Sequence, residues 1–453
     1  MQPLPKEFEE QMKRLLGEAG FFAYLDALNQ PYARALRVNL LLRPDGTPPC
    51  PIEGLGAPVP WAKGAYFVEG DARPGLSPLH EGGLFYMQEP SALTAVTALD
   101  PQPGERVLDL CAAPGGKSTQ IAALMAGRGL LCCNEPIPSR AQILSRNIER
   151  MGVRNAVVLS AMPDALAPRF PAFFDRILVD APCSGEGMFR RQPEARDEWD
   201  ADAPRRCADR QMEILAQAAK MLRPGGTMVY STCTFNDTEN EGVLKRFLAL
   251  HPEFSLVPFA LPGLPEAKDG YLHLYPHEMR GEGHFVSRLK KTDGADEADA
   301  PVQAAPQRKA PAHAAAKGKA PAPIALPDVF SDAFAPERLY TAGDALWMLP
   351  EEISIERLSG LRVLRTGLLL AHAEGKRSEP DHALAMALRP EEAARTASLT
   401  QTQALAYQAG ETLSLGDLPG GYTLLCCEGV SLGWGKQAGG LMKNHYPKGL
   451  RRR

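Results

Sequence analysis

The sequence predicts an α/β fold whose centre is a doubly wound, Rossmann-like domain. From residue 103 onward, short apolar runs alternate with helical segments, and turns that contain glycine separate them. One apolar run, residues 176–179, leads directly into Asp180 and is broken by Ala181-Pro182, as is typical of a strand buried on both faces. Parallel sheets bind ligands beyond the carboxyl ends of their strands, so polar residues at such ends are the first site candidates.

A small α+β unit is predicted ahead of this domain. Apolar residues at helical spacing predict an N-terminal helix, namely Phe8, Met12, Leu15 and Leu16. Residues 37–42 read as a strand, and the Pro- and Gly-rich residues 44–60 as a loop. An apolar helix is expected over residues 91–99, with Ser91 as its N-cap.

Strands and helices then alternate through the central domain. Strands are predicted at residues 106–110, 130–134, 156–159, 176–179 and 227–231. Helices are predicted at residues 118–126, 139–151, 205–222 and 239–250. Residues 284–289 are expected to return as an antiparallel strand at the edge of the sheet.

Changes in composition divide the chain into four parts. We predict an N-terminal domain over residues 1–75, a central domain over 76–290, and globular C-terminal modules over 328–453. Residues 291–327 are rich in Ala and Pro, with almost no large apolar residues, and are expected to be a flexible linker. In the last part, residues 422–427 and 430–434 read as strands on either side of a short turn.

Bulk properties exclude several classes of protein. No apolar run approaches the ~20 residues of a membrane span, and the polar N-terminus does not resemble a signal peptide. A cytoplasmic protein without membrane contact is therefore expected. The nine cysteines show no Cys-x-x-Cys pair or metal-like spacing, so we expect free thiols and no metal site. A net charge of −4 argues against a wholly basic nucleic-acid coat but leaves room for a local basic groove.

The stretch after the first central strand has the features of a cofactor loop. Gly115 and Gly116 stand between a strand and a helix, where glycines let a ligand approach the backbone. Glu135 follows the next strand nineteen positions after Gly116, close to the ~20 expected for an acid that holds ribose hydroxyls. S-adenosylmethionine fits this pattern. A phosphate-binding loop remains an alternative because Gly116-Lys117-Ser118 match its end, although Cys111 replaces its first glycine.

Two cysteines follow strands that we expect to be neighbours. Cys183 comes three residues after Asp180, and Cys233 follows the strand at residues 227–231. A single cysteine at a strand end is more often packing, but two that face one pocket suit methylation at C5 of cytosine. That reaction needs a thiolate to attack C6, a carboxyl group where charge develops at N3, and a base that removes the C5 proton. Cys233, Asp180 and Cys183 are the candidates for these roles.

Three motifs carry a family resemblance: residues 109–117 (DLCAAPGGK), 180–187 (DAPCSGEG) and 231–235 (STCTF). They resemble the signature motifs of the Sun-type RNA 5-methylcytosine methyltransferases. The whole layout, including the tail at residues 439–451, is similar to the bacterial RsmF-like branch that acts on small-subunit ribosomal RNA. The resemblance implies a methyltransferase domain between RNA-binding parts, a small one at the N-terminus and C-terminal modules of which the last is PUA-like.

The resemblance also implies roles for particular residues. The methionine part of S-adenosylmethionine would be held by Cys111, Ala112, Ala113, Pro114, Gly115, Gly116 and Lys117. Glu135 would bind the ribose, and Arg140 and Asp180 would lie close to the cofactor. Cys233 would be the nucleophile, and Cys183 would assist release of the product. Asp164 lies later than the acid that usually holds adenine and follows a proline, so adenine recognition stays open.

RNA is the expected partner, as ribosomal RNA or a small ribosomal subunit, and the protein is expected to be a monomer. The target cytosine must be single-stranded or flipped out of a helix. Two interpretations stay open for five arginines near the site: they contact RNA phosphates, or they form a solvent-exposed face. They are Arg190, Arg191, Arg196, Arg205 and Arg206. The last eighteen residues carry six Lys or Arg and no acid. With Tyr446 among them and Trp434 just ahead of them, they form either an RNA-stacking surface or a disordered end.

Three rival functions remain open at this point. Within the same chemistry, the substrate could be transfer RNA. Outside it, the chain could hydrolyse a nucleotide or act as a non-catalytic RNA-binding protein of ribosome assembly.

Overall fold

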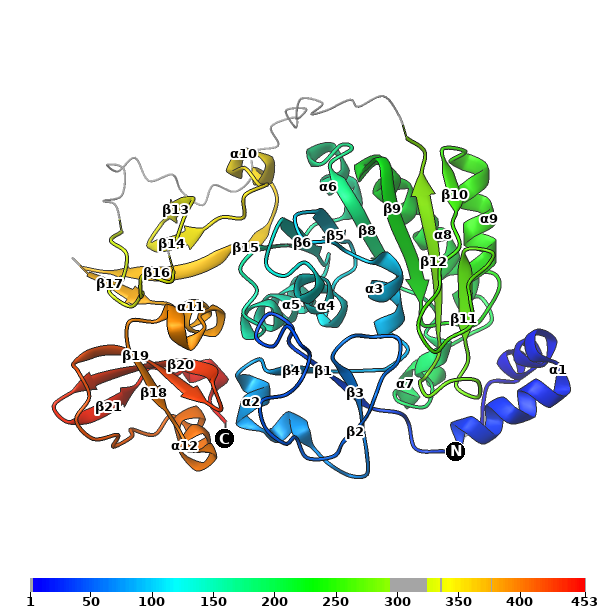
Figure 1. Cartoon of the computed structure of the whole chain (residues 1–453). Helices are drawn as coiled ribbons and strands as arrows, with labels where there is room; N and C mark the ends of the chain where they lie inside the picture. The colour runs from blue at the N-terminus through cyan, green and yellow to red at the C-terminus, as the bar shows by residue number, and fades with distance from the viewer. Residues whose placement is uncertain (1–2, 294–323, 335, 376, 453) are drawn as a thin grey trace.

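One large sheet forms the centre of the computed structural model, which describes residues 3–293, 324–334, 336–375 and 377–452 (Figure 1). The sheet has nine strands in the order β10-β12-β9-β8-β5-β6-β7-β15, and β11 pairs with β12. Its parallel strands are β5 (Arg106–Asp109), β6 (Leu130–Asn134), β7 (Ala156–Leu159), β8 (Phe174–Asp180) and β9 (Leu222–Thr232). The strand order reverses between β5 and β8, which confirms the predicted doubly wound fold.

Helices cover both faces of this sheet. They are α3 (Leu93–Leu99), α4 (Gly116–Leu124), α5 (Pro138–Arg150), α6 (Pro163–Leu166), α8 (Ala203–Met221) and α9 (Asn240–Leu250). Successive strand residues point to opposite faces, so Leu108 and Ile177 join a core with α6, α8 and α9. Val107 and Leu178 join a second core with α3, α4 and α5. This double burial explains why the strands read as continuous apolar runs.

The edge of the sheet differs from the prediction at both ends. β12 (His284–Lys291) is antiparallel to β9, as expected, but β10 (Phe254–Leu256) and β11 (Tyr271–Leu274) pair with it, so it is not an edge strand. At the other end, β15 (Val363–Thr366) comes from the C-terminal part and pairs antiparallel with β7. β10 and β15, the strands at the two ends of the sheet, are too short to show a periodicity in the sequence, and only their pairing in the fold reveals them.

The N-terminal part combines the kinked helix α1 (Lys6–Leu28) with a sheet in the order β2-β3-β1-β4. Its strands are β1 (Ala35–Val38), β2 (Leu55–Pro58), β3 (Ala65–Val68) and β4 (Phe85–Gln88), and α2 (Pro78–Glu81) precedes β4. The strand predicted at 37–42 is β1, which already ends at Val38. It ends there because the Asn39 side-chain amide donates to the carbonyls of Gly83 and Met151 and the chain turns at this point.

Two other local predictions in this part were wrong. The segment predicted as loop, residues 44–60, contains β2. Ser91 is not the N-cap of α3; that position is held by Ala92, and the Ser91 hydroxyl donates to Glu89 instead. Glu89 also accepts the backbone N–H groups of Ser91 and Ala92, so a carboxylate from the preceding loop does the capping.

The C-terminal part holds two small sheets. The first contains β13 (Leu339–Ala342), β14 (Ala345–Met348), β16 (Leu368–Glu374) and β17 (Arg377–Pro380). The second contains β18 (Thr396–Ser398), β19 (Gly421–Cys427), β20 (Val430–Ala438) and β21 (Leu441–Asn444). α10 (Ile355–Leu358), α11 (His382–Ala387) and α12 (Gln401–Ala409) complete it. β19 and β20 are the predicted hairpin, and most of the predicted linker lies outside the described residues.

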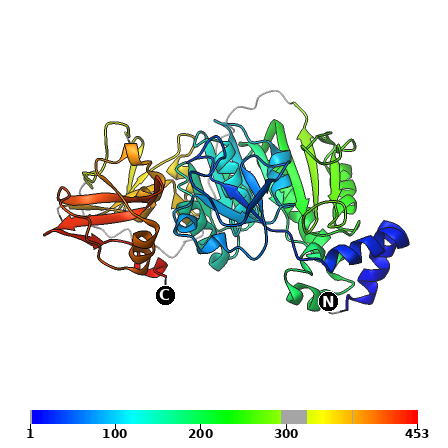
Figure 2. The same cartoon turned by 60° about the horizontal axis from the view of Figure 1, so that its bottom comes forward.

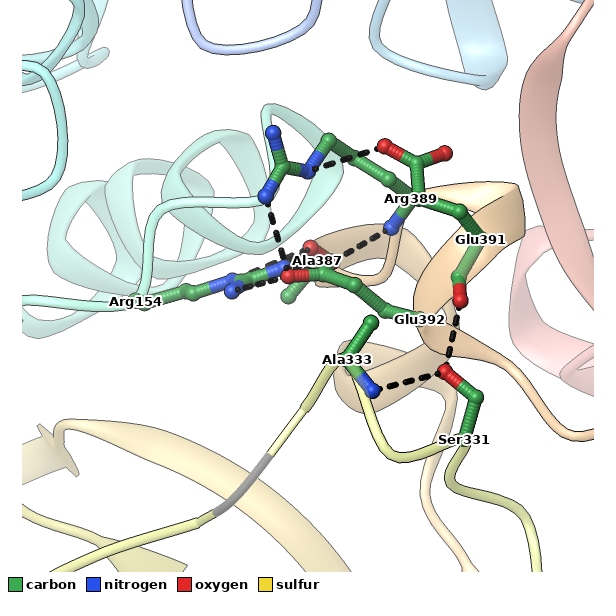
Figure 3. Close-up of polar contacts among 7 residues, drawn as sticks. All are labelled: Arg154, Ser331, Ala333, Ala387, Arg389, Glu391 and Glu392. Atoms are coloured by element: carbon green, nitrogen blue, oxygen red, sulfur yellow. Dashed lines mark hydrogen bonds and ion pairs between the residues drawn. The ribbon is translucent and has the colours of Figure 1, made fainter.

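The C-terminal sheets lie at one end of the molecule and α1 at the other, in both views (Figures 1 and 2). At the junction, the Arg154 guanidinium bonds the Ala387 carbonyl and both carboxylate oxygens of Glu392 (Figure 3). Arg389 contacts the same carboxylate. Further along, the Gln408 amide on α12 donates to the Pro78 carbonyl of α2 at 3.0 Å. In the part of the chain that the structure describes, no helix is both long and apolar enough to cross a membrane.

Candidate active site

The loop between β5 and α4 is held closely against α5. Gly115 has a φ of 113°, the left-handed region that favours glycine, and a Cβ there would lie 3.3 Å from the Cβ of Asn147. The Asn147 amide donates to the Pro114 carbonyl at 2.9 Å, and the Arg140 guanidinium donates to the Ala113 carbonyl at 3.1 Å. The predicted cofactor residues from Cys111 to Lys117 thus form one ordered turn at the carboxyl end of β5.

Glu135 and Arg140 lie beside this loop. Glu135 follows β6 directly, and one carboxylate oxygen accepts the backbone N–H of Ile137 at 3.0 Å. The other oxygen lies 3.4 Å from the Arg140 guanidinium. Because β6 is the neighbour of β5, the sheet brings Glu135, the residue predicted to bind the ribose, next to the loop predicted to bind the methionine part of the cofactor.

Asp109, the last residue of β5, is buried without a cation in contact among the described residues. One of its carboxylate oxygens accepts the Ser118 hydroxyl at 2.6 Å, which ties the first turn of α4 to the strand. Its other oxygen has no hydrogen-bond partner in the described structure. Burial raises the pKa of Asp109 to about 7.

Asp180 lies at the end of β8 and has a different environment. Lys117 Nζ contacts one carboxylate oxygen at 2.8 Å, and the Ser231 hydroxyl donates to the other at 2.8 Å. His284 Nε2 lies 3.5 Å from the same second oxygen. Burial alone would raise the pKa of Asp180, but Lys117 and His284 outweigh it and hold the pKa below its usual value. The carboxylate is therefore ionised at neutral pH.

The two predicted cysteines meet in the loops that follow β8 and β9. Asp180 pairs with Ser231 in the parallel register, so the loops begin at the same level of the sheet. Cys183 Sγ and Cys233 Sγ are 3.3 Å apart, and both residues are half-buried. Contact with Cys233, together with burial, raises the pKa of Cys183 well above its usual value. The raised pKa keeps Cys183 a neutral thiol at neutral pH.

Four further residues of the site received no role from the sequence. Ser231 and His284 contact Asp180, and Glu186 and Glu239 bind the two cysteine loops. Ser231 and Glu186 lie inside the quoted motifs, where a glutamate between two glycines was a usable signal. His284 and Glu239 depend on which strands pair and which loops meet, and no local pattern marks them.

Several residues considered for RNA contact have other roles. Arg190 is nearly buried, forms a bidentate ion pair with Glu282, and donates to the Ala27 carbonyl. Arg196 is also buried. Arg205 and Arg206 are exposed beside Asp202 and Asp200, in salt bridges of 3.9 and 2.7 Å. Arg191 lies over the ring of Tyr32, which is 45% exposed. Asp164 is exposed on α6 and stays without an assigned role.

The C-terminal tail differs from both of its expected forms. Trp434 and Tyr446 are buried, and the indole N–H of Trp434 donates to the Asp381 carbonyl at 2.9 Å. These aromatic rings are therefore core residues and not stacking surfaces. Residues 436–452 are also not a disordered end, because they form part of β20, all of β21 and a short helical turn at Lys448–Leu450.

Family models match this chain along most of its length. Residues 4–90 match the N-terminal domain of 16S rRNA methyltransferase RsmF, and residues 96–290 match the 16S rRNA methyltransferase RsmB/F model. Residues 327–388 match the first C-terminal domain of the RsmF rRNA methyltransferase, and residues 394–452 match the methyltransferase RsmF PUA domain.

Curated relatives and a solved structure agree with these matches. Ribosomal RNA small subunit methyltransferase F of Erwinia tasmaniensis is 33% identical over 98% of this chain and 96% of its own length. The protein of the same name from Enterobacter sp. strain 638 is 35% identical over 98% of this chain and 95% of its own. A methyltransferase homolog protein from Pyrococcus horikoshii is similar in structure, with 30% identity and a TM-score of 0.54. It aligns over 63% of this chain and 95% of that one.

Proposed function

Because the chain belongs to the ribosomal RNA small subunit methyltransferase F family, we propose that it methylates C5 of a cytosine in 16S rRNA. The observation that supports this reaction most directly is the 3.3 Å contact between the thiols of Cys183 and Cys233. Nucleophilic oxygen and nitrogen atoms of RNA accept a methyl group without covalent help. C5 of cytosine needs activation by a thiolate, and product release needs a second group nearby.

S-adenosylmethionine is the methyl donor of this family, and the residues present fit it. The loop from Cys111 to Lys117 lies at the carboxyl end of β5, and Glu135, which follows the neighbouring strand β6, offers a carboxylate to the ribose hydroxyls. Arg140 contacts both the loop and Glu135. When bound, the cofactor supplies an electrophilic methyl group.

Cys233 acts first, because its thiolate forms the bond to C6 of the cytosine. The Cys183 thiol, which keeps its proton, can donate to the Cys233 sulfur across their contact. The negative charge that develops at N3 during the attack calls for a charged N–H donor, and Lys117, which lies 2.8 Å from Asp180, is the candidate. The ionised Asp180 has no proton to donate and instead orients Lys117. Ser231 holds the second oxygen of Asp180 and so fixes the orientation of the carboxylate.

Cys183 acts in the release step. After methyl transfer the C5 proton must leave before the bond between Cys233 Sγ and C6 can break. Cys183 is the side chain in contact with Cys233. Its thiol first gives its proton to bulk water, and the resulting thiolate, a strong base because the pKa of Cys183 is raised, then accepts the C5 proton and becomes a thiol again. Loss of the C5 proton returns the electron pair to the ring, and Cys233 leaves as the thiolate.

The product identifies the reaction. Purified protein incubated with S-adenosylmethionine and either 16S rRNA or small ribosomal subunits should yield 5-methylcytidine, detected by mass spectrometry of the digested RNA. Cys233→Ala should yield none. Transfer RNA in a parallel reaction tests the rival substrate. A methyl group in any other nucleoside, or binding of ATP without binding of S-adenosylmethionine, would contradict the proposal.

A further inference from the structure

The loops that carry the two cysteines are joined by a pair of buried carboxylates, one from each loop. We propose that Glu186 and Glu239 form a reciprocal clasp that positions the thiols of Cys183 and Cys233 relative to each other. They are positioning residues, since neither contacts a sulfur atom. The inference rests on the proposed function, because it concerns the alignment of the two thiols that this function uses.

Glu186 belongs to the Cys183 loop but binds the Cys233 loop. One carboxylate oxygen accepts the backbone N–H groups of Phe235 and Asn236 at 2.9 and 3.0 Å. The other accepts the Asn236 side-chain amide at 3.1 Å and the Gln11 amide of α1 at 3.0 Å. Glu186 therefore fixes the backbone two and three residues after Cys233.

Glu239 makes the opposite connection. It follows Cys233 in the chain, and its carboxylate accepts the backbone N–H of Ser184, the residue directly after Cys183, at 3.1 Å. It also accepts the Ser184 hydroxyl and, at 2.7 Å, the Gln211 amide of α8. The Asn236 amide donates to Glu239 at 2.8 Å as well as to Glu186, so the two carboxylates share one donor.

Direct contacts between the loops strengthen the clasp. The backbone N–H of Gly187 donates to the Cys233 carbonyl at 2.8 Å, and the hydroxyls of Ser184 and Thr234 are 2.7 Å apart. A Cβ at Gly187 would lie 2.9 Å from the Cys233 carbonyl oxygen. The two loops thus approach as closely as glycine permits, and a small displacement of either one moves a thiol.

The burial of the two clasp carboxyl groups is difficult to explain by stability alone. Glu186 and Glu239 are almost fully buried, and among the described residues neither forms a salt bridge with Lys, Arg or His. Burial raises the pKa of Glu239. Two buried carboxylates held only by neutral donors cost desolvation energy that packed apolar side chains would avoid. What each provides is two acceptor oxygens, one more than an amide side chain offers and two more than an apolar one.

Adduct formation in a Cys183→Ala background tests the clasp, because that background isolates the attack by Cys233 from the release step. Glu186→Gln should slow adduct formation about 10- to 100-fold, the cost of a small misplacement of a reacting group. The Gln amide has one acceptor oxygen in place of two, so its N–H₂ would face donors in either orientation: the backbone N–H groups of Phe235 and Asn236, or the side-chain amides of Asn236 and Gln11. Calorimetric binding of S-adenosylmethionine should stay unchanged, because Glu186 is not part of the cofactor loop.

A milder variant and a matched control separate positioning from stability. Ser184→Ala removes one hydroxyl from the clasp without adding bulk, and should slow adduct formation roughly threefold to tenfold. Glu392→Gln alters a buried carboxylate in the distant C-terminal junction (Figure 3), so it should lower the melting temperature and leave the adduct rate unchanged. Equal adduct rates in all three variants and their Cys183→Ala parent would overturn the clasp.

A second readout does not depend on RNA. With both cysteines present, diamide takes two hydrogens from the Cys183 and Cys233 thiols, so a disulfide forms and diamide is reduced to the hydrazine. Peptide mapping should show this disulfide forming more slowly in Glu186→Gln and Ser184→Ala than in the unaltered protein or in Glu392→Gln. Unchanged oxidation rates would count against the clasp. Absence of any adduct in the Cys183→Ala parent would contradict the proposed function, while the oxidation rates would still decide on the clasp.

Discussion

Three carboxyl groups near the ends of β5, β8 and β9 have shifted pKa values that differ because their neighbours differ. Asp180 is ionised because Lys117 and His284 lie against it. Asp109 has only a hydroxyl donor, and its pKa rises to about 7. Glu239 accepts several neutral donors, and burial still raises its pKa. The pKa of each group therefore follows from its neighbours, and Asp180 is the one whose pKa is held below its usual value.

The Asp109 carboxyl group should make stability depend on pH. Its folded-state pKa of about 7 exceeds the ordinary 3.8, so the folded protein holds this proton more tightly than the unfolded chain. The resulting stabilisation is complete below about pH 4 and is lost as the pH rises through 7. In Asp109→Asn this dependence disappears. Relative to the variant, the unaltered protein should therefore lose about 2–4 kcal/mol of unfolding free energy between pH 4 and pH 8.

Urea denaturation of both proteins across this pH range measures the difference. Parallel stability curves for the two proteins would show that the folded state does not hold the Asp109 proton.

At the scale of elements, the sequence was most informative where a segment is buried on both faces. Residues 130–134 and 156–159 are strands with the predicted bounds, because their apolar runs are unbroken and glycine or proline lies nearby. β15 was missed because its partner β7 lies about two hundred residues earlier. Likewise, the motifs predicted the residues at the strand ends, whereas the role of Glu239 depends on two loops meeting.

β15 offers a test of how strongly the C-terminal part supports the sheet. Arg365 on β15 is buried and pairs with Glu149 of α5. Arg365→Ala leaves the Glu149 carboxylate without its cation, and should lower the free energy of unfolding by about 3 kcal/mol. Arg362→Ala, at an exposed position just before β15, should change it by less than about 0.5 kcal/mol. Similar urea midpoints for the two variants would mean that this ion pair does not support the sheet.

For the whole molecule, the resemblance predicted C-terminal modules but not how they dock. α12 and the tail contact the α2 region, where Arg452 donates to the carbonyls of Leu76 and Ser77. Arg146 of α5 reaches the Gly449 carbonyl at 3.4 Å. The basic tail is therefore fixed beside the helix that also supports the cofactor loop. Composition alone could not show this, because a basic tail has the same composition whether it is folded or free.

The docked tail should contribute to RNA binding through its exposed lysines. Lys443 and Lys448 are exposed on this surface. Changing both to Glu should weaken binding of a 16S rRNA fragment roughly threefold to tenfold and lower the salt dependence by about 1 per lysine. Lys245→Glu with Lys268→Glu should have little effect, because these exposed positions lie on α9 and between β10 and β11, at the end of the sheet away from β15. Filter binding over a salt series measures both quantities, and equal losses in the two double variants would exclude a specific role for the tail.

The most direct test of the central claim compares the two cysteine variants on a denaturing gel after incubation with S-adenosylmethionine and labelled 16S rRNA. Cys183→Ala can attack C6 but cannot complete release, so it should accumulate a protein–RNA adduct that survives denaturation. Cys233→Ala cannot attack and should form none. An adduct in Cys233→Ala but not in Cys183→Ala would reverse the two roles, and no adduct in either variant would contradict the covalent mechanism.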